Sequence, residues 1–396
     1  MDVKGKQFAL ITSAIINLVG ELWLYSCASV PYLAHSIYPV MVAAFIKGVG
    51  SASTVSRIGF WSYATSTAPL KWRSTFLGLI ATVGWVGQTV TSAGLATVVG
   101  MDKPTPTFFY GCVTWALYTN AITYLLPDDP PTSNSKLAGE GLSVRALLRS
   151  FVDSFAFSFR DSSTTLLVSS FLLASIAKDG FRKVGARTLV LNLGMNSQKL
   201  VHYAVAEFVF HRIICAVAIP LFLFIHGLFA NNNNSPVQVD AVNSIDKAPP
   251  ENTDGGEDKD QIVQHNSKVQ DETVIWRLEL LMTRCFFVAA SLGAVIILSR
   301  STDSMYLAGS ALISLLTPSL MCSISLLTIH APSFSLSRAL AGVAIVDEMG
   351  RLVQIAINAL IANGIAFNNL PVKSVVLACL VMTISGSLLP GFVRRT

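Results

Sequence analysis

The sequence predicts an all-α membrane protein with about ten transmembrane helices, and composition, hydropathy and the placement of charge all indicate it. Of the 396 residues, 52% are hydrophobic and only 13% are charged, and the mean hydropathy is +0.57. A soluble domain carries about 25% charged residues. The charged residues here cluster between 231 and 277, and long uncharged stretches recur elsewhere. This pattern excludes a soluble enzyme, a nucleic-acid-binding protein and a disordered chain.

Each expected span is an apolar stretch of about 20 residues, the length that an α-helix needs to cross the hydrocarbon core. In chain order the ten stretches are 8–27, 37–59, 75–99, 106–126, 163–190, 203–229, 279–299, 304–329, 338–366 and 373–391. The stretch 163–190 differs from the others because charged residues interrupt it around Gly180. We expect that helix to break at Gly180; the alternative is that the span ends at Ala177 and the charged residues after it lie at a surface.

Two segments between the spans are predicted to lie outside the membrane. Residues 127–162 begin as a turn-rich linker and continue with apolar and basic residues at helical spacing, which is typical of an amphipathic helix on the cytoplasmic leaflet. Residues 231–274 are polar and acidic, so we expect a disordered loop. These segments divide the chain into a four-span bundle over 1–126, the linker, and a six-span bundle over 163–396.

The placement of Lys and Arg predicts the orientation of this multi-pass protein. With the N-terminus in the cytoplasm, the inner loops hold 15 basic residues and the outer loops hold four, namely Lys103, Lys199, Arg300 and Lys373. Cytoplasmic loops of membrane proteins carry such an excess of basic residues. We therefore expect both termini and the loop 231–274 to be cytoplasmic.

Several short motifs, in the right order along the chain, resemble signatures of the major facilitator superfamily. They are the Asp, Gly and Lys of residues 2–6, the small residues after Lys47 in 46–52, Tyr63 with Arg73, the small-residue stripe over 84–94, and the acidic-plus-glycine pattern of 346–350. The first resembles the family's loop between helices two and three, and the second resembles its fourth helix. Tyr63 and Arg73 resemble the residues that flank the loop from helix four to helix five. The last two resemble parts of the fifth and the eleventh helix. On this resemblance the first bundle lacks helices one and two.

The resemblance implies two helix bundles around a central cavity and secondary transport of a small solute by alternating access, with protons as a possible coupling ion. It implies no cofactor and no metal. The sequence also lacks H-E-x-x-H, G-x-S-x-G and G-x-x-x-x-G-K-[ST], the motifs of common hydrolases and nucleotide-binding loops. The alternative is a truncated or transport-inactive membrane protein that acts as a scaffold or regulator through its cytoplasmic loops.

Ionisable residues within the spans are candidate functional residues, because each costs at least ~2.5–3.5 kcal/mol at bilayer depth. Glu21 and Lys47 lie near mid-depth in neighbouring spans, so we expect a structural ion pair, with a substrate or proton role for Lys47 as the alternative. Asp347 and Glu348 can both reach Arg351 at helical spacing. One arginine for two acids leaves an acid in excess, which could carry protons or stabilise a structural network.

The other candidates lie on two further spans. Lys178, Asp179 and Arg182 form either an anion-attracting patch or part of the protein surface, and the stretch that contains Glu207, His211 and Arg212 carries a polar network. We expect Arg57 and Arg284 to extend to the membrane interface. The complete set expected along the substrate or proton pathway is Lys47, Asp179, Arg182, Arg212, Asp347, Glu348 and Arg351.

The predicted orientation makes Asn233 a test of topology, because Asn233 opens an Asn-x-Ser sequon in the loop 231–274. A cytoplasmic loop never meets the glycosylation machinery, so we expect no glycan at this residue. Gel mobility after expression in microsomes, with and without glycosidase treatment, measures this directly. A glycosidase-sensitive shift that Asn233→Gln removes would invert the topology.

Overall fold

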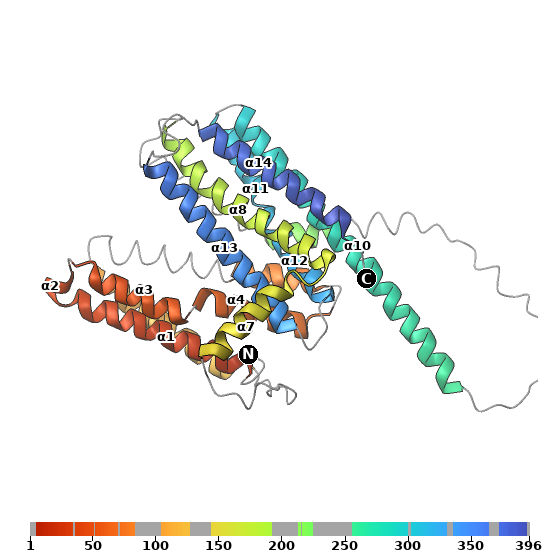
Figure 1. The fold of residues 1–396 in the computed structure, drawn as a ribbon, viewed down its shortest axis with the longest axis horizontal. Coiled ribbons are helices and arrows are strands. Elements are labelled where there is room, and N and C mark those ends of the chain that lie inside the picture. The colour runs from red at the N-terminus through yellow and green to blue at the C-terminus, as the bar shows by residue number, and fades with distance from the viewer. Residues whose placement is uncertain are drawn as a thin grey trace, which may run out of the picture.

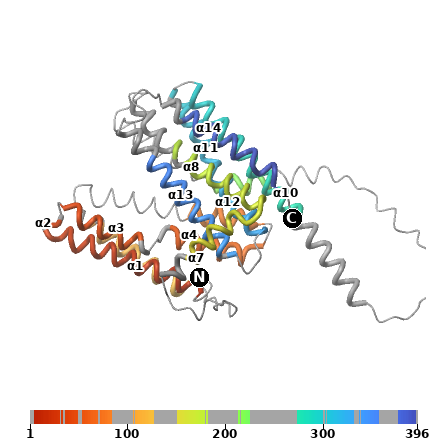
Figure 2. Tube along the Cα trace, viewed as in Figure 1, coloured from red at the N-terminus to blue at the C-terminus, as the bar shows by residue number. Residues whose placement is uncertain are grey.

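The computed structural model describes the helical framework of the chain. The described residues are 5–34, 36–50, 52–69, 72–83, 104–126, 144–191, 213–214, 216–224, 256–299, 302–330, 336–363 and 372–393. Throughout them the regular structure is helical (Figure 1). The tube in Figure 2 traces the same path and marks in grey the parts whose placement is uncertain.

The first helices pack into an N-terminal helix group. Its members are α1 (Lys6–Ala28), α2 (Pro31–Ala34), α3 (Tyr38–Gly50), α4 (Ala52–Thr67) and α6 (Pro104–Leu125). Helix α1 contacts α2, α3, α4 and α6, and Leu10, Tyr63 and Ile122 form a small buried cluster. The expected span 37–59 is thus built from two helices, and α4 continues eight residues beyond its expected end.

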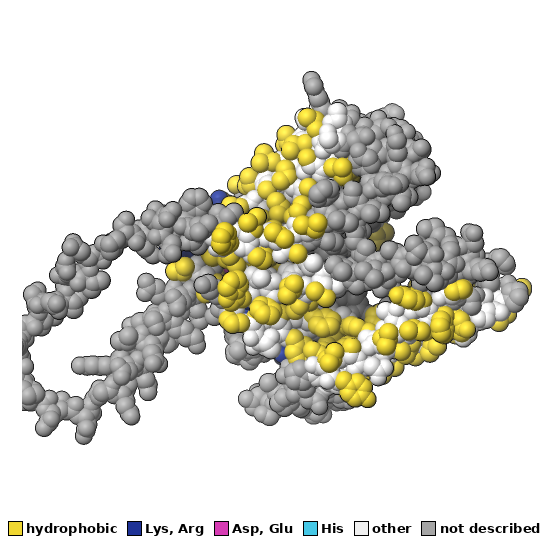
Figure 3. Space-filling model, turned by 180° about the vertical axis from the view of Figure 1, so that it is seen from behind, with side chains coloured by type: hydrophobic (Ala, Val, Ile, Leu, Met, Phe, Trp, Pro, Cys, Tyr) yellow, Lys and Arg dark blue, Asp and Glu magenta, His cyan; other side chains and the backbone are white. Residues whose placement is uncertain are grey.

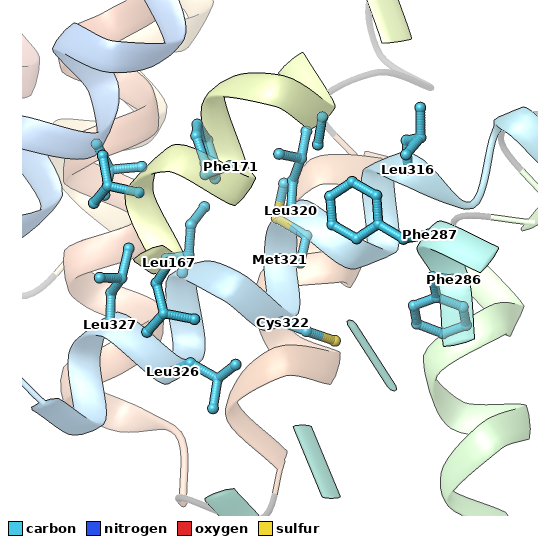
Figure 4. Packing of buried hydrophobic residues seen from close by; sticks show 14 of the residues in the cluster. Leu167, Phe171, Phe286, Phe287, Leu316, Leu320, Met321, Cys322, Leu326 and Leu327 are labelled. Atoms are coloured by element: carbon cyan, nitrogen blue, oxygen red, sulfur yellow. The ribbon is translucent and has the colours of Figure 1, made fainter. Parts of the chain in front are cut away.

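The later helices pack into a C-terminal helix group. Its members are α7 (Val144–Phe157), α8 (Ser162–Leu191), α10 (Gly256–Ser299), α11 (Asp303–Ile313), α12 (Leu316–His330), α13 (Leu336–Asn363), α14 (Val372–Leu388) and the 3₁₀ turn η4 (Leu389–Phe392). Helix α8 contacts α12, α13 and α14, while α10 contacts α11, α12 and α14. Phe171, Phe287 and Leu320 lie in the large buried cluster that these helices share (Figure 4).

Helix α4 joins the two groups. It contacts α1 in one group and α13 in the other, and its Trp61 and Ala64 belong to the large cluster of the C-terminal group. Leu77, on the helix Arg73–Val83, belongs to the same cluster. In Figure 1 the groups meet at α4 and diverge from there, with α2 at the far end of one arm and the end of α13 on the other.

Hydrophobic side chains cover much of the outer surface of both groups (Figure 3). Phe45 of α3 is 74% exposed and Leu117 of α6 is 66% exposed, far more apolar surface than a helix facing water presents. Among the described helices, Lys6–Ala28, Thr273–Ser299 and Ser304–His330 have the length and hydropathy of a membrane span, the last of them built from α11 and α12. These surfaces match a protein whose solvent is lipid.

The break expected at Gly180 is wrong. Helix α8 continues without interruption from Ser162 to Leu191. A Cβ atom at residue 180 would lie 2.8 Å from Sγ of Cys379 on α14. Gly180 therefore allows close packing of two helices and does not interrupt one.

The expected disordered loop 231–274 is also wrong in its second part. Helix α10 begins at Gly256 and runs for 44 residues into the apolar span, while residues 231–255 lie outside the described part of the chain. Extending an existing helix costs far less than nucleating a new one. By contrast, α7 lies where the amphipathic helix was expected, and it packs against α13.

Two glycines set the approach of α10 to α11, and their replacement tests this packing. A Cβ at Gly293 would lie 2.5 Å from the carbonyl oxygen of Gly309, and a Cβ at Gly309 would lie 2.7 Å from that of Gly293. Backbone cannot yield as a flexible side chain does, so we expect Gly293→Ala to destabilise the protein by about 1–3 kcal/mol. Thermal unfolding in detergent measures the loss.

The matched control is Gly48→Ala on α3, where a Cβ would meet nothing within 4 Å. Because Ala is favoured over Gly within helices by roughly 0.5–1 kcal/mol, this substitution should leave the unfolding temperature unchanged or slightly raised. Equal effects of the two substitutions would show that the glycine contact does not limit the helix packing.

Candidate functional site

An ion network joins the two helix groups where α4 meets α13. Arg57 of α4 donates hydrogen bonds from its two terminal nitrogens to Asp347 and Glu348 of α13. Thr54, one turn earlier on α4, donates to Oε1 of Glu348 at 2.9 Å. A guanidinium group suits this role because its planar fork can bind two carboxylates at once. One side chain therefore ties α4 to two acidic residues of the other group.

Helix α8 contributes the third side of the network. The Asp347 residue is 3% exposed, and its Oδ1 accepts a hydrogen bond from Oγ of Ser175 at 2.5 Å. Lys178, one turn further along α8, lies near enough to act electrostatically on Asp347. The buried carboxylate is thus held by groups from α4 and α8 as well as from its own helix.

Arg351 is the looser partner of the two acids. Its terminal nitrogens lie 3.5 Å from Oδ2 of Asp347 and 3.6 Å from Oε1 of Glu348, and its side chain is 39% exposed. The helical spacing did bring these three residues together. The excess of acid expected from it is wrong, however, because Arg57 and Lys178 raise the described cations of the network to three against two carboxylates.

The expectation that Arg57 extends to the membrane interface is wrong as well. It rested on a span ending near residue 59, whereas α4 continues to Thr67, nearly three turns beyond Arg57. Its guanidinium also lies 6.0 Å from the ring of Trp61, one turn away. A part-buried arginine in an apolar protein needs partners, and the acids of α13 supply them.

A second ion pair lies inside the N-terminal helix group. Nζ of Lys47 on α3 lies 2.5 Å from Oε1 of Glu21 on α1. Glycines make room for it: a Cβ at Gly20 would lie 2.8 Å from Cγ of Lys47, and one at Gly111 would lie 3.0 Å from the carboxyl carbon of Glu21. The structure therefore brings together Glu21 and Lys47, the two residues that we expected to pair because both lie near the middle of the membrane.

The other candidates are only partly placed. Asp179 and Arg182 lie within α8, but their side chains are outside the described part of the structure, as are Glu207, His211 and Arg212 entirely. Arg284 is exposed on α10. The sequence analysis missed Thr54, Ser175 and the partners of Arg57, all of which meet across more than 170 residues of sequence.

The described helices define an all-α, multi-pass integral membrane fold. No family model and no curated protein sequence matches the chain, but solved structures do. FucP, a major facilitator superfamily transporter crystallised in the outward conformation, aligns with a TM-score of 0.59 and 10% identity, over 100% of this chain and 85% of that chain. A bacterial homologue of the iron transporter ferroportin in an outward-facing state aligns with a TM-score of 0.57 and 13% identity, over 98% and 83%. Over nearly its whole length the chain therefore has the fold of major facilitator superfamily transporters, as its motifs led us to expect.

The ion network predicts a large effect for the loss of Arg57. Removing one partner of a buried ion pair leaves an uncompensated charge and costs about 3–5 kcal/mol, so Arg57→Met should lower the unfolding temperature in detergent strongly. Arg57→Lys should recover only part of the loss, because an ammonium group lacks the fork.

Arg284→Met, at an exposed arginine of α10, is the matched control and should change stability by no more than about 0.5 kcal/mol. If Arg57→Met and Arg284→Met unfold at the same temperature, the network does not hold the two helix groups together.

Proposed function

We propose that this protein is a secondary active transporter of a small solute that works by alternating access. In this proposal residues 1–126 and 163–396 form the two moving bundles, with 127–162 as the linker between them. The observation that carries the proposal is the ion network between α4 and α13. It is a polar contact between the two helix groups, and such a contact can form in one conformation and break in another.

The energetics of the network suit a switch. Charges buried at the junction are favourable only while they are paired, so separation of the bundles requires that each charged group find water, a proton or a solute instead. Among the described residues the network carries one more cation than anions. An arriving anionic group or a departing proton would both change this balance.

Protons are the proposed coupling ion. The Glu348 side chain is 37% exposed while that of Asp347 is 4% exposed, so Glu348 is the acid that water reaches more readily. Protonation of Glu348 would remove one of the two negative charges that hold Arg57. An anionic group of the solute could then take the place of Glu348 beside Arg57, which is how binding of a proton could be linked to binding of the solute.

The solute path is proposed to include Lys47, Asp179, Arg182, Arg212 and Arg351, together with the two acids of α13. One of the structures with this fold is described as a fucose:proton symporter and another as a homologue of an iron transporter. Their cargoes differ in charge and size, so the fold does not fix the substrate. We propose a multi-pass topology with both termini and the loop 231–255 in the cytoplasm.

One observation favours the alternative of a scaffold or regulator. Helix α10 begins at Gly256 with a polar stretch and continues into the apolar span Thr273–Ser299. A polar helix outside the apolar span offers a surface to other proteins. A measurement of solute flux across the membrane distinguishes a transporter from a scaffold, because a scaffold moves no solute.

The test is solute uptake by proteoliposomes that contain the purified full-length chain, with a panel that includes fucose, small organic anions and iron. We expect uptake of at least one solute to depend on an imposed pH gradient. The double substitution Asp347→Asn/Glu348→Gln should abolish that dependence, because neither amide can exchange a proton.

The control is Asp153→Asn, which removes an exposed carboxylate on α7 and should leave the dependence on pH intact. Uptake that ignores both the pH gradient and the double substitution would overturn proton coupling. The absence of uptake for every solute in the panel would favour the scaffold.

A further inference from the structure

A second polar cluster lies where the helix Arg73–Val83 meets the C-terminal helix group. A terminal nitrogen of Arg73 donates to Oγ1 of Thr328 on α12 at 3.1 Å. Leu77, one turn further, is fully buried in the cluster that contains residues of α10 and α12. The first turn of this helix therefore covers part of the C-terminal group in the conformation that the structure describes.

Beneath this cover lies Glu279 of α10, which is only 2% exposed. Its Oε1 accepts a hydrogen bond from Oγ of Ser325 on α12 at 2.7 Å. Its Oε2 is buried and, within the described part of the chain, has no hydrogen-bond partner. The carboxyl group is therefore only half satisfied, in contrast to Asp347, both oxygens of which are bonded.

Within the described helices, few titratable groups face this carboxyl group. Arg73, with its neighbour Ser74, faces it across the junction; Cys322 faces it from α12. His330 stacks on Trp276. Trp276 lies less than one turn before Glu279 on α10. Arg73 favours an ionised carboxylate, while one of its terminal nitrogens donates to Thr328. Burial of an ionised oxygen without a partner is the larger effect.

We infer that Glu279 is a proton-binding site, separate from the Asp347 and Glu348 network. Glu279 holds a proton while the helix Arg73–Val83 covers it, and it releases the proton to water when that helix separates from α12. The inference rests on the proposed alternation of the two bundles. A proton on Oε2 removes the buried charge, and Oε1 keeps the hydrogen bond from Ser325.

The sign of the pH dependence follows from this geometry. If the covered conformation holds a proton that the uncovered one releases, acid favours the covered conformation and that preference is lost as the pH rises. Glu279→Gln mimics the protonated group in shape and charge. It should therefore keep the covered conformation at every pH.

The experiment measures the distance between the bundles in lipid. Spin labels attached at Ser26→Cys on α1 and Ser304→Cys on α11, both exposed positions, report one helix group each, after Cys285 and Cys215 are replaced by Ser. From about pH 5 to about pH 9, a range that spans the titration of a buried carboxyl group, the chain with native Glu279 should change from one label distance to another. The Glu279→Gln chain should keep the low-pH distance throughout.

The matched control is Thr283→Val, one turn along the same buried face of α10, which leaves the carboxyl group in place and should titrate like the unmodified chain. A pH-independent distance in the chain with native Glu279 overturns the inference without any variant, and so does an unchanged titration in Glu279→Gln. Solute uptake is measured in the same vesicles. Uptake with a pH-independent label distance refutes the proton site alone, whereas a pH-dependent distance without uptake of any solute refutes the proposed function alone.

Discussion

The cost of burying charge in an apolar protein shapes this molecule more than any other constraint. Asp347 is almost fully buried, in a protein whose outer surface is built for lipid. Such a carboxylate is stable only with close partners, and the nearest come from three helices: Arg57 on α4, Ser175 on α8 and Arg351 on α13. The position of α4 against α13 follows from that requirement, and so does the meeting of the two helix groups.

The same constraint explains the difference between the polar clusters of the junction. At the Asp347 cluster every described charge has an opposite charge nearby, so opening must break ion pairs. At Glu279 one oxygen has no described partner, so neutralisation by a proton is the less costly solution. The small residues around these clusters are part of the arrangement. Gly180 lets α8 approach α14, which helps to fix the helix that carries Ser175.

Features set by local chemistry could be predicted from the sequence, and features set by distant contacts could not. Hydropathy located the three described spans of full membrane length, because the bilayer demands apolar helices of fixed length. Helical spacing brought Asp347, Glu348 and Arg351 together. Sequence reasoning missed the role of Arg57 because its partners lie 290 and 291 residues away. It also misjudged Gly180, because a glycine that breaks a helix and one that admits a neighbouring helix look identical without the neighbour.

The most direct test of a moving junction is the flux through a chain whose junction cannot open. Arg73→Cys and Thr328→Cys, at positions whose native side chains meet across the junction, can be bridged by a short bifunctional thiol reagent. In proteoliposomes that take up solute, bridging should stop the uptake, while each single-cysteine chain treated with the same reagent should retain it. Uptake by the bridged chain at the unbridged rate would show that the two helix groups do not separate here, and alternating access across this junction would be wrong.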